Sequence, residues 1–383
     1  MKVVFRTDAS IQIGTGHVMR CMTLAKALSE KGAEVQFICR NHIGNLIEKI
    51  QNEGFKVYTL NTSYDEVLCH SVQGESMKSL PCGAEQLCHY FQTNESPVPK
   101  LSHSDWLGAT QQEDAIECHS ILQQIHPDWL VVDHYSIDAS WQKILKNLYR
   151  KLMVIDDLGD RRHISDLLLD QNYGSTVDKY QKLVPKNCKI LAGAQYALLR
   201  PEFAKWRHFS LERRKNNQKV KGILITLGGV DSGNITGQVL QQLSKAELDS
   251  GIEVTIVMGL TSPHLKAIEQ QAESLNFKTS VRINVNNIAE LMANADLAIG
   301  AAGATTWERC CLGVPTIQLV IAENQRQVAE RLAIDGVVKS IYQPKELVSL
   351  LSTALDWMPS LGQIASGVCD GHGCDRVINT MCS

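Results

Sequence analysis

Short apolar segments alternate with segments of helical periodicity along most of this chain. We predict strands at residues 3–6, 35–39, 57–60, 129–133, 152–155 and 190–192 in the first half, and at 222–227, 254–258, 297–300 and 316–320 in the second. Such alternation is typical of parallel sheets covered by helices on both faces. A chain of 383 residues has room for two domains of this kind. We therefore predict an α/β protein with two Rossmann-type, doubly wound parallel-sheet domains that face a central cleft.

The polar segment 211–220 marks the expected boundary between these domains. It is rich in Arg, Lys, Asn and Gln, which fits a linker, although the solvated face of a helix fits equally well. We predict an N-terminal domain at residues 1–210 and a C-terminal domain at residues 211–383. Residues 61–115 have no sustained period and contain several turn formers, so we predict an insertion there: a lid, a contact surface or an arm.

The charge balance argues against two classes of partner. The chain has 38 Lys and Arg residues against 41 Asp and Glu residues, a net charge of −3. No basic surface is implied, so we expect neither nucleic-acid binding nor polybasic membrane binding. Arg6 and Asp8 interrupt the N-terminal apolar run, which therefore does not resemble a signal peptide, and no apolar run is long enough to span a membrane. We expect a cytoplasmic protein.

The 12 cysteines raise the question of a metal site. Cys369, His372, Cys374 and Cys382 lie close in sequence, and Cys-His pairs occur at residues 69–70 and 88–89. Neither group has the spacing of a zinc site, and no Cys-x-x-Cys pair occurs. We therefore expect reduced thiols and no bound metal.

A glycine-bracketed loop at residues 14–21 joins the first predicted strand to a helix. Gly14 and Gly16 flank Thr15, and His17 stands where the helix begins. Glycines allow a ligand to approach the backbone, and the free N–H groups of a helix start favour an anion. The same positive helix end disfavours an imidazolium, so we expect a neutral His17 that can act as a base. A tight turn with a surface or core histidine is the alternative.

Two common nucleotide-binding motifs are absent from this loop. Met19 occupies the third glycine position of the dinucleotide fingerprint, and Arg40 follows the second strand where a ribose-binding acid is expected. No Gly-Lys-Ser/Thr sequence occurs either. A nicotinamide-dependent enzyme or a phosphate-loop NTPase is therefore not indicated.

A second loop with ligand-binding character follows the strand at residues 297–300. Gly303, Thr305 and Thr306 lead into a helix that carries Glu308 in its first turn. Backbone N–H groups and hydroxyls suit a diphosphate, and a carboxylate suits paired ribose hydroxyls. A threonine N-cap followed by a first-turn acid is the alternative, and it needs no ligand.

Nine motifs, in this order, give the chain a family resemblance. They lie at residues 6–10, 14–21, 132–135, 154–158, 166–172, 197–203, 227–231, 305–310 and 322–325. The chain resembles the UDP-2,4-diacetamido-2,4,6-trideoxy-β-L-altropyranose hydrolases of bacterial pseudaminic acid synthesis, which are related in fold to MurG and the two-domain GT-B glycosyltransferases. The resemblance covers nearly the whole chain apart from the predicted insertion.

The resemblance implies a reaction and a set of site residues. Water attacks the anomeric carbon of a UDP-linked diacetamido sugar, and the carbon–oxygen bond breaks with inversion to release UDP and the free sugar, which would serve flagellin glycosylation. His17 takes the place of the catalytic base. Tyr135, Arg200, Glu308 and Asn324 take the places of substrate-binding residues. The resemblance implies no metal, no cofactor, and no partner beyond the UDP-sugar and water, although the predicted insertion could make contacts.

The chemistry of the residues agrees with these roles and leaves alternatives open. Gly14–Gly16, Gly303–Thr306 and Arg200 are candidate donors to the leaving diphosphate, whose charge grows as the bond breaks. Arg200 could instead serve a hinge before Pro201, and Tyr135 could be a buried aromatic with a bonded hydroxyl. Asp8 is a candidate to orient His17. The alternative functions are a GT-B glycosyltransferase with a UDP-amino-sugar donor and a non-catalytic sugar-nucleotide-binding protein.

Overall fold

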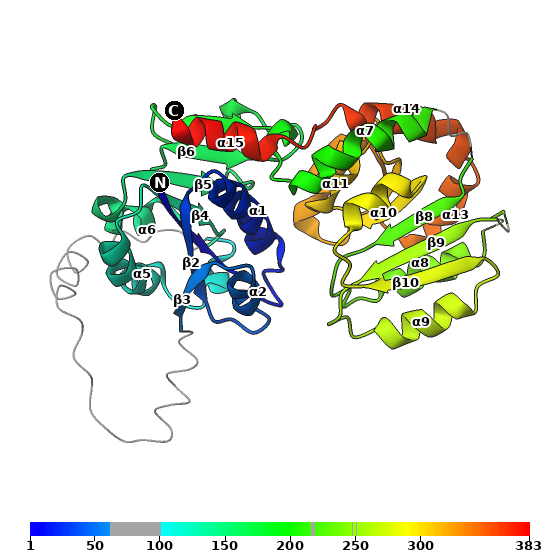
Figure 1. The fold of residues 1–383 in the computed structure, drawn as a ribbon, viewed down its shortest axis with the longest axis horizontal. Helices are drawn as coiled ribbons and strands as arrows, with labels where there is room; N and C mark the ends of the chain where they lie inside the picture. The colour runs from blue at the N-terminus through cyan, green and yellow to red at the C-terminus, as the bar shows by residue number, and fades with distance from the viewer. Residues whose placement is uncertain (62–100, 216–218, 247, 250) are drawn as a thin grey trace, which may run out of the picture. The chain divides into compact units, whose positions relative to one another are not determined.

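The computed structural model describes residues 1–61, 101–215, 219–246, 248–249 and 251–383. The chain divides into two compact units, which Figure 1 shows with the chain coloured from its N-terminus to its C-terminus. The first unit contains Met1–Asp170, Thr176–Ala192 and Met381–Ser383. The second contains Gln171–Ser175 and Gly193–Thr380. Among the described residues, no helix combines the length and the apolar character needed to cross a membrane.

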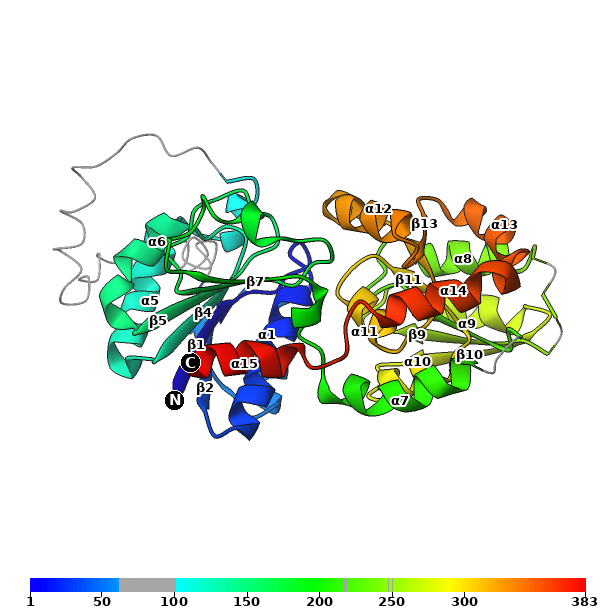
Figure 2. The same ribbon diagram turned by 90° about the horizontal axis from the view of Figure 1, so that it is seen from above.

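The first unit is built on a parallel sheet of seven strands in the order β3-β2-β1-β4-β5-β6-β7. The strands are β1 (Lys2–Thr7), β2 (Glu34–Arg40), β3 (Lys56–Leu60), β4 (Trp129–Asp133), β5 (Lys151–Ile155), β6 (Leu167–Asp170) and β7 (Lys189–Ala192). The helices are α1 (Gly16–Glu30), α2 (Ile47–Asn52), α5 (Gln111–Ile125) and α6 (Ala139–Ile144), with short helical turns η1 (Ser104–Leu107), η2 (Lys146–Leu148) and η3 (Val177–Lys179). Figures 1 and 2 show α1 and α2 on one face of the sheet and α5 and α6 on the other.

The second unit repeats the plan with a parallel sheet of six strands in the order β10-β9-β8-β11-β12-β13. The strands are β8 (Gly222–Thr226), β9 (Glu253–Met258), β10 (Lys278–Ile283), β11 (Leu297–Ala301), β12 (Thr316–Leu319) and β13 (Lys339–Ile341). The helices are α7 (Pro201–Lys215), α8 (Ile235–Leu243), α9 (Leu265–Glu273), α10 (Ile288–Asn294), α11 (Thr305–Cys311), α12 (Arg326–Ile334), α13 (Leu347–Leu351), α14 (Ala354–Ser366) and α15 (Gly373–Cys382), with turns η4 (Ala194–Tyr196), η5 (Glu323–Gln325) and η6 (Pro344–Glu346). The last two residues of α15 belong to the first unit.

The apolar runs form strands because both faces of each sheet are buried. In β8, Ile223 and Ile225 pack into one core, whereas Leu224 between them packs into the core on the opposite face. Successive side chains of a strand point to opposite faces, so a strand covered on both sides needs apolar residues at consecutive positions. The prediction of two doubly wound parallel sheets is confirmed.

Three strands of the structure, β6, β10 and β13, are missing from the prediction. β10 lies at the edge of its sheet and none of its six residues is buried, so polar side chains interrupt its apolar pattern. β13 has only three residues. β6 is fully buried, but its three leucines favour helix as much as strand.

The end of the predicted insertion has regular structure. α5 begins at Gln111, and Thr110 and Glu113 form a capping box at its start. Asp114 and Ala115 in its first turns are fully buried. Residues 111–115 therefore belong to the helix between β3 and β4, in contrast to the expected range of 61–115. Residues 101–110 are also described and contain η1, whereas residues 62–100 of the predicted insertion lie outside the described residues.

The predicted domain boundary at residue 210 falls within α7 of the second unit. Residues 211–215 form the end of that helix, and residues 216–218 lie outside the described part of the chain.

Each sheet has a point where the strand order reverses. In the first unit the chain moves outward from β1 through β2 to β3, then returns to place β4 on the other side of β1. In the second unit β8 and β11 have the same relationship. Ligands of open parallel sheets bind at the carboxyl ends of the strands beside such a point. In each unit, the loops that follow these two strands are therefore the candidate ligand-binding loops.

Candidate active site

The loop after β1 presents His17 at the start of α1. Gly14 has a φ of +80°, in the left-handed region that favours glycine, and its N–H donates to the carbonyl of Ser10 at 2.8 Å. This N–H is therefore engaged within the turn, which corrects the expectation that Gly14 donates to an anion. Thr15 and Gly16 are exposed, and Thr15 makes no side-chain capping bond. The N–H groups of Thr15 and Gly16 remain the candidate donors.

The apolar face of α1 fixes the direction of this helix. Cys21, Leu24, Ala25 and Leu28 are fully buried, and the helix ends before Gly32, which has a φ of +82°. The periodicity of the sequence therefore places His17 in the first turn of α1, where only 7% of its surface is exposed.

Asp133, the last residue of β4, orients the His17 imidazole. The Nδ1 atom of His17 lies 2.6 Å from Oδ1 of Asp133. Because an ionised carboxylate can only accept, Nδ1 carries the hydrogen and donates it. The lone pair is then on Nε2, the ring atom that can take a proton from a nucleophile. The arrangement is that of a histidine base held by a carboxylate.

Arg20 keeps Asp133 ionised. Its Nε and Nη2 atoms donate to the two oxygens of Asp133 at 2.6 and 2.7 Å, and its Nη1 donates to Asp157 at 3.0 Å. Burial alone would raise the pKa of the Asp133 carboxyl, but Arg20, together with His17, holds that pKa well below its ordinary value. The carboxylate therefore stays available to His17 throughout the physiological pH range.

Tyr135 closes one side of this group. Its ring meets the His17 ring edge-on, with centroids 4.6 Å apart and planes at 86°. It is 8% exposed, and burial followed by the neighbouring Asp157 raises the pKa of its hydroxyl well above the ordinary value. The hydroxyl remains protonated and hydrogen-bonds to Asp157. The alternative of a buried aromatic with a bonded hydroxyl therefore describes Tyr135 correctly, although the ring is part of the site.

Asp8 does not take the orienting role suggested by the sequence. Its Oδ1 accepts from Arg6 at 2.6 Å and from the Arg40 backbone N–H at 2.7 Å, and its Oδ2 lies 3.3 Å from Nε2 of His134. Asp114 accepts from both Arg6 and Arg40. The side chains of Arg6, Asp8, Arg40 and Asp114 are all 0% exposed. Asp8 belongs to this buried ion network, which holds the loop after β1.

The loop after β11 in the second unit contains the other predicted group. Gly303 is exposed, but its N–H donates to the Thr306 hydroxyl at 3.3 Å. Thr305 is half-buried, and its hydroxyl is a candidate donor to a ligand. Thr306 is 2% exposed: its N–H donates to the Gly303 carbonyl at 2.9 Å and its hydroxyl donates to Gln318 at 2.9 Å. Both donors of Thr306 are therefore engaged, which corrects its expected role as a ligand donor. Thr306 braces the loop from inside.

Arg309 lies beneath this loop and is missing from the sequence-based site. It is 1% exposed and donates to the Ala301 carbonyl at 2.8 Å and to the hydroxyls of Thr305 and Thr306 at 3.1 and 3.2 Å. No carboxylate among the described residues forms a salt bridge with it, and its Nε has no hydrogen-bond partner. Burial lowers the pKa of Arg309 to about 10, so it remains charged at pH 7. A Cβ on Gly300 would lie 2.3 Å from Nη1 of Arg309, so Gly300 makes room for this cation.

Glu308 and Arg200 lie together in the second unit. Nη2 of Arg200 is 3.5 Å from Oε1 of Glu308, and Nη1 of Arg200 is 3.0 Å from Glu202. The side chains of Arg200 and Glu308 are 31% and 17% exposed, so a ligand can reach both. Burial raises the pKa of Glu308 against the opposing effect of Arg200. The side chain of Asn324 lies outside the described part; its backbone is in η5.

The structure thus brings the predicted residues together in two groups. Thr15, Gly16, His17 and Tyr135 meet at the reversal point of the first sheet, and Arg200, Gly303, Thr305 and Glu308 meet at that of the second. Within the described ranges, no group of three or more His, Cys, Asp or Glu residues is arranged to hold a metal ion. Cys369 and Cys374 donate to backbone carbonyls of Trp307 and Leu199. The Cys-His pairs at 69–70 and 88–89 lie outside the described residues.

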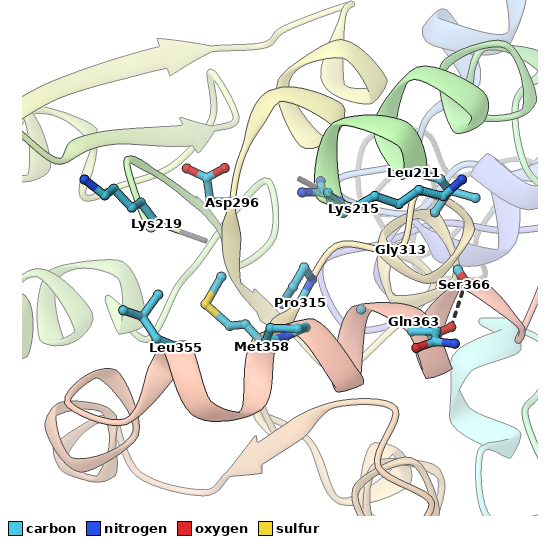
Figure 3. Close-up of a pocket in the computed structure, with 13 residues that line it drawn as sticks. Leu211, Lys215, Lys219, Asp296, Gly313, Pro315, Leu355, Met358, Gln363 and Ser366 are labelled. Carbon is cyan, nitrogen blue, oxygen red and sulfur yellow. Dashed lines mark hydrogen bonds between the residues drawn. The ribbon is translucent and has the colours of Figure 1, made fainter. Parts of the chain in front are cut away.

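A pocket of about 700 Å³ in the second unit lies at the opposite end of its sheet. Asp296 and Pro315, which line it, directly precede β11 and β12. Figure 3 shows Leu211 and Lys215 of α7 on one side and Leu355 and Met358 of α14 on the other. None of the predicted site residues lines this pocket. We therefore do not assign the nucleotide to it.

Comparisons with known proteins agree with this architecture. The sequence model of the glycosyltransferase family 28 C-terminal domain matches residues 222–358. The UDP-2,4-diacetamido-2,4,6-trideoxy-beta-L-altropyranose hydrolase of Campylobacter jejuni is 26% identical over 337 residues, which cover 88% of this chain and 97% of that protein. The family resemblance is confirmed.

Two further similarities extend this result. Spore coat polysaccharide biosynthesis protein SpsG of Bacillus subtilis is 27% identical over 330 residues, 82% of this chain and 94% of that protein. The crystal structure of MurG from Acinetobacter baumannii superposes with a TM-score of 0.66 at 16% identity and covers 99% of both chains. The fold is therefore GT-B-like, as predicted.

Sequence reasoning missed Asp133, Arg20 and Arg309. All three lie within the motifs that carry the resemblance, but we predicted no role for any of them from the sequence. A signal was available for Asp133, because a carboxylate at the end of a buried strand beside the first strand falls at the reversal point. Arg309 had no such signal, since nothing in a helical pattern distinguishes a buried arginine from an exposed one.

Proposed function

We propose that this protein hydrolyses the anomeric carbon–oxygen bond of UDP-2,4-diacetamido-2,4,6-trideoxy-β-L-altropyranose. The reaction releases UDP and the free diacetamido sugar, with inversion and without a metal, in the cytoplasm. One observation carries the proposal: a nearly buried histidine whose Nδ1 lies 2.6 Å from a buried carboxylate, at the reversal point of the first sheet. The similarity to the Campylobacter jejuni hydrolase, whose name gives this UDP-sugar, supports the choice of substrate.

His17 acts as the general base in the proposed reaction. Water is a weak nucleophile at neutral pH, and a positioned base contributes typically about 10²–10⁴-fold to the rate. Nε2 of His17 removes a proton from the water as its oxygen attacks the anomeric carbon. Asp133 stabilises the imidazolium that forms, because its carboxylate already accepts the Nδ1 hydrogen. Attack on the face opposite to UDP gives inversion.

The leaving group requires positive charge and N–H donors. The diphosphate gains charge as the bond breaks, so donors aimed at it act on the transition state. In the second unit the hydroxyl of Thr305 can donate to the diphosphate, with Arg309 beneath the loop and Arg200 paired with Glu308 nearby. We propose that Glu308 accepts the ribose hydroxyls. Thr15 and Gly16 remain candidate ligand donors beside His17 in the first unit.

The first experiment follows purified protein and the UDP-sugar by NMR, without acceptor or added metal. We expect release of UDP together with the inverted free sugar.

His17→Ala should abolish turnover but keep UDP affinity close to that of the wild type, measured by calorimetry. Full activity of His17→Ala would refute the role of His17 as the general base. Glu308→Gln should weaken UDP binding, and unchanged affinity would refute its ribose role.

A glycosyltransferase is the second candidate, because the matched family model is a glycosyltransferase C-terminal domain. The donor half of such an enzyme would have the same loops as those described above. The two functions differ in the acceptor, since a transferase needs an alcohol where the hydrolase uses water. A substrate that stays intact without acceptor, despite demonstrated UDP binding, would favour the transferase or a protein that only binds the sugar nucleotide.

A further inference from the structure

An aromatic cluster adjoins His17 in the first unit. Trp106 stacks on Tyr135 with ring centroids 5.7 Å apart and planes at 30°. His103 lies 4.3 Å from Trp106 and 5.4 Å from Tyr135, centroid to centroid. Tyr135 in turn meets His17 edge-on at 4.6 Å. Trp106 and His103 come from the segment before α5 and have no part in the function proposed above.

The short helical turn that carries Trp106 is fixed to the body of the unit. Leu107 is 1% exposed and packs into the core with Leu122 and Trp141. The Ser136 hydroxyl, in the loop after β4, donates to the His103 carbonyl. Gly108 has a φ of +70° and packs closely against His42 and Arg40. Trp106 and His103 are therefore held against the loop that contains Tyr135.

Both rings remain accessible, in contrast to the nearly buried rings beneath them. Trp106 and His103 are half-buried, whereas Tyr135 and His17 are 8% and 7% exposed. Burial lowers the pKa of His103, so its ring is uncharged at pH 7. Partly exposed aromatic rings thus lie beside Tyr135 and His17, the proposed base.

We propose that Trp106 and His103 form the sugar subsite and select for deoxygenated, N-acetylated sugars. This inference rests on the proposed function, because it places the sugar at His17. The methyl groups of two acetamido substituents and of a 6-deoxy carbon are apolar, and each gains by contact with an aromatic ring. Ligand sites are lined mainly by apolar and aromatic side chains, with a few polar groups that fix orientation.

Binding in an inactive background tests the proposal without interference from turnover. All proteins carry His17→Asn, and calorimetry measures Kd for the UDP-diacetamido-trideoxy sugar and for UDP alone. Trp106→Leu should raise the Kd of the sugar nucleotide about five- to tenfold and leave the Kd of UDP unchanged, because UDP lacks the sugar. Trp106→Phe, which keeps an aromatic ring, should change Kd less than about twofold. Phe55→Leu is the matched control, since Phe55 is a half-buried aromatic at the amino end of β3.

The outcomes separate this inference from the function on which it rests. If the reference protein binds UDP and the sugar nucleotide, and Trp106→Leu binds both as tightly, the aromatic subsite is refuted while the proposed function stands. If Trp106→Leu weakened the binding of both ligands equally, the aromatic subsite would also be refuted, because the effect would then not depend on the sugar. If the reference protein binds neither ligand, the proposed function fails and the subsite fails with it.

Discussion

His17 and Asp133 are 116 positions apart in the chain, yet their side chains are 2.6 Å apart in the folded protein. The contact depends on two adjacent strands, since β1 leads to the helix of His17 and β4 ends at Asp133. Arg20, one helical turn after His17, completes the group by binding the same carboxylate. His17, the carboxylate that binds it and the arginine that binds this carboxylate thus come from only two elements, α1 and β4.

Replacement of Asp133 tests this dependence. In Asp133→Asn the amide cannot stabilise an imidazolium, so we expect kcat to fall by about 10²-fold or more with a much smaller change in KM. Steady-state kinetics on the UDP-sugar would measure the split. Asp128→Asn is the matched control, because Asp128 lies just before β4 and pairs at the surface with Arg150. Equal kcat values for Asp133→Asn and wild type would contradict the orienting role.

Gly300 offers a second test at the residue scale. In Gly300→Ala the new Cβ would lie 2.3 Å from Nη1 of Arg309 and displace the cation from the loop. Overpacking of this kind costs typically about 1–3 kcal/mol. We expect a lower free energy of unfolding and UDP binding weaker by about tenfold, measured by calorimetry. Gly222→Ala in β8 is the control, since its nearest neighbour would be at an ordinary 3.8 Å; a similar loss there would show that the effect is not specific.

Among the elements, α5 has the most unusual attachment to the sheet. Asp114 in its first turns accepts from Arg6 of β1, from Arg40 of β2 and from the Trp141 indole of α6. Two guanidinium groups and one carboxylate are buried together at 0% exposure. A buried charge left without its partner is strongly destabilising, so this helix is tied to the strands by electrostatics as well as by apolar packing.

The Asp114→Asn variant should therefore lose about 3–5 kcal/mol in the free energy of unfolding. Glu117→Gln gives a control on the same helix and the same arginine, because Glu117 lies 3.1 Å from Arg40 but is 39% exposed. Because the Glu117 side chain is 39% exposed, we expect its pair with Arg40 to contribute less than about 1 kcal/mol. Urea unfolding of both variants would measure the difference. If the two variants lost similar amounts of unfolding free energy, burial of the ion network would not be the cause of the effect.

For the whole molecule, buried groups of two kinds make stability depend on pH. Burial, followed by the charge of Arg161, lowers the pKa of His163 to about 3, so this histidine is neutral in the folded state. Burial alone would raise the pKa of Asp8, but Arg6 holds it well below its ordinary value, and Asp114 is also lowered. In each case the unfolded chain binds the proton more readily. Stability therefore falls as pH falls.

The sign of each shift gives the pH range. The contribution of neutral His163 is complete above its unfolded pKa of about 6.5 and is lost at about 1.4 kcal/mol per pH unit down to about pH 3. The contribution of the carboxylates is complete above about pH 4 and is lost below it. We expect the urea midpoint to fall between pH 7 and pH 4.5, and His163→Gln to flatten that fall. A midpoint independent of pH over this range would exclude the prediction.

The sequence by itself determined the local structure and its repetition. Consecutive apolar residues indicate strands buried on both faces, as in β4 and β8, because only such strands need apolar side chains on both sides. The spacing of Cys21, Leu24 and Leu28 indicates the buried face of α1, and so places His17 at the start of that helix. Edge strands such as β10 were missed, because a strand with polar side chains shows no apolar pattern.

Only the tertiary structure decided which polar groups meet. Asp8 follows β1 and Asp133 ends β4, so both carboxylates lie at the carboxyl end of an apolar strand. Asp8 nevertheless binds Arg6 and Arg40, whereas Asp133 binds His17. From its type and position, Thr306 is expected in a ligand-binding loop and Arg309 on the surface of a helix. Both side chains are instead buried beneath the loop. The physical reason is that hydrophobic periodicity encodes which face of an element is buried. The pairing of charges depends on strand order, which brings together residues that no local pattern connects.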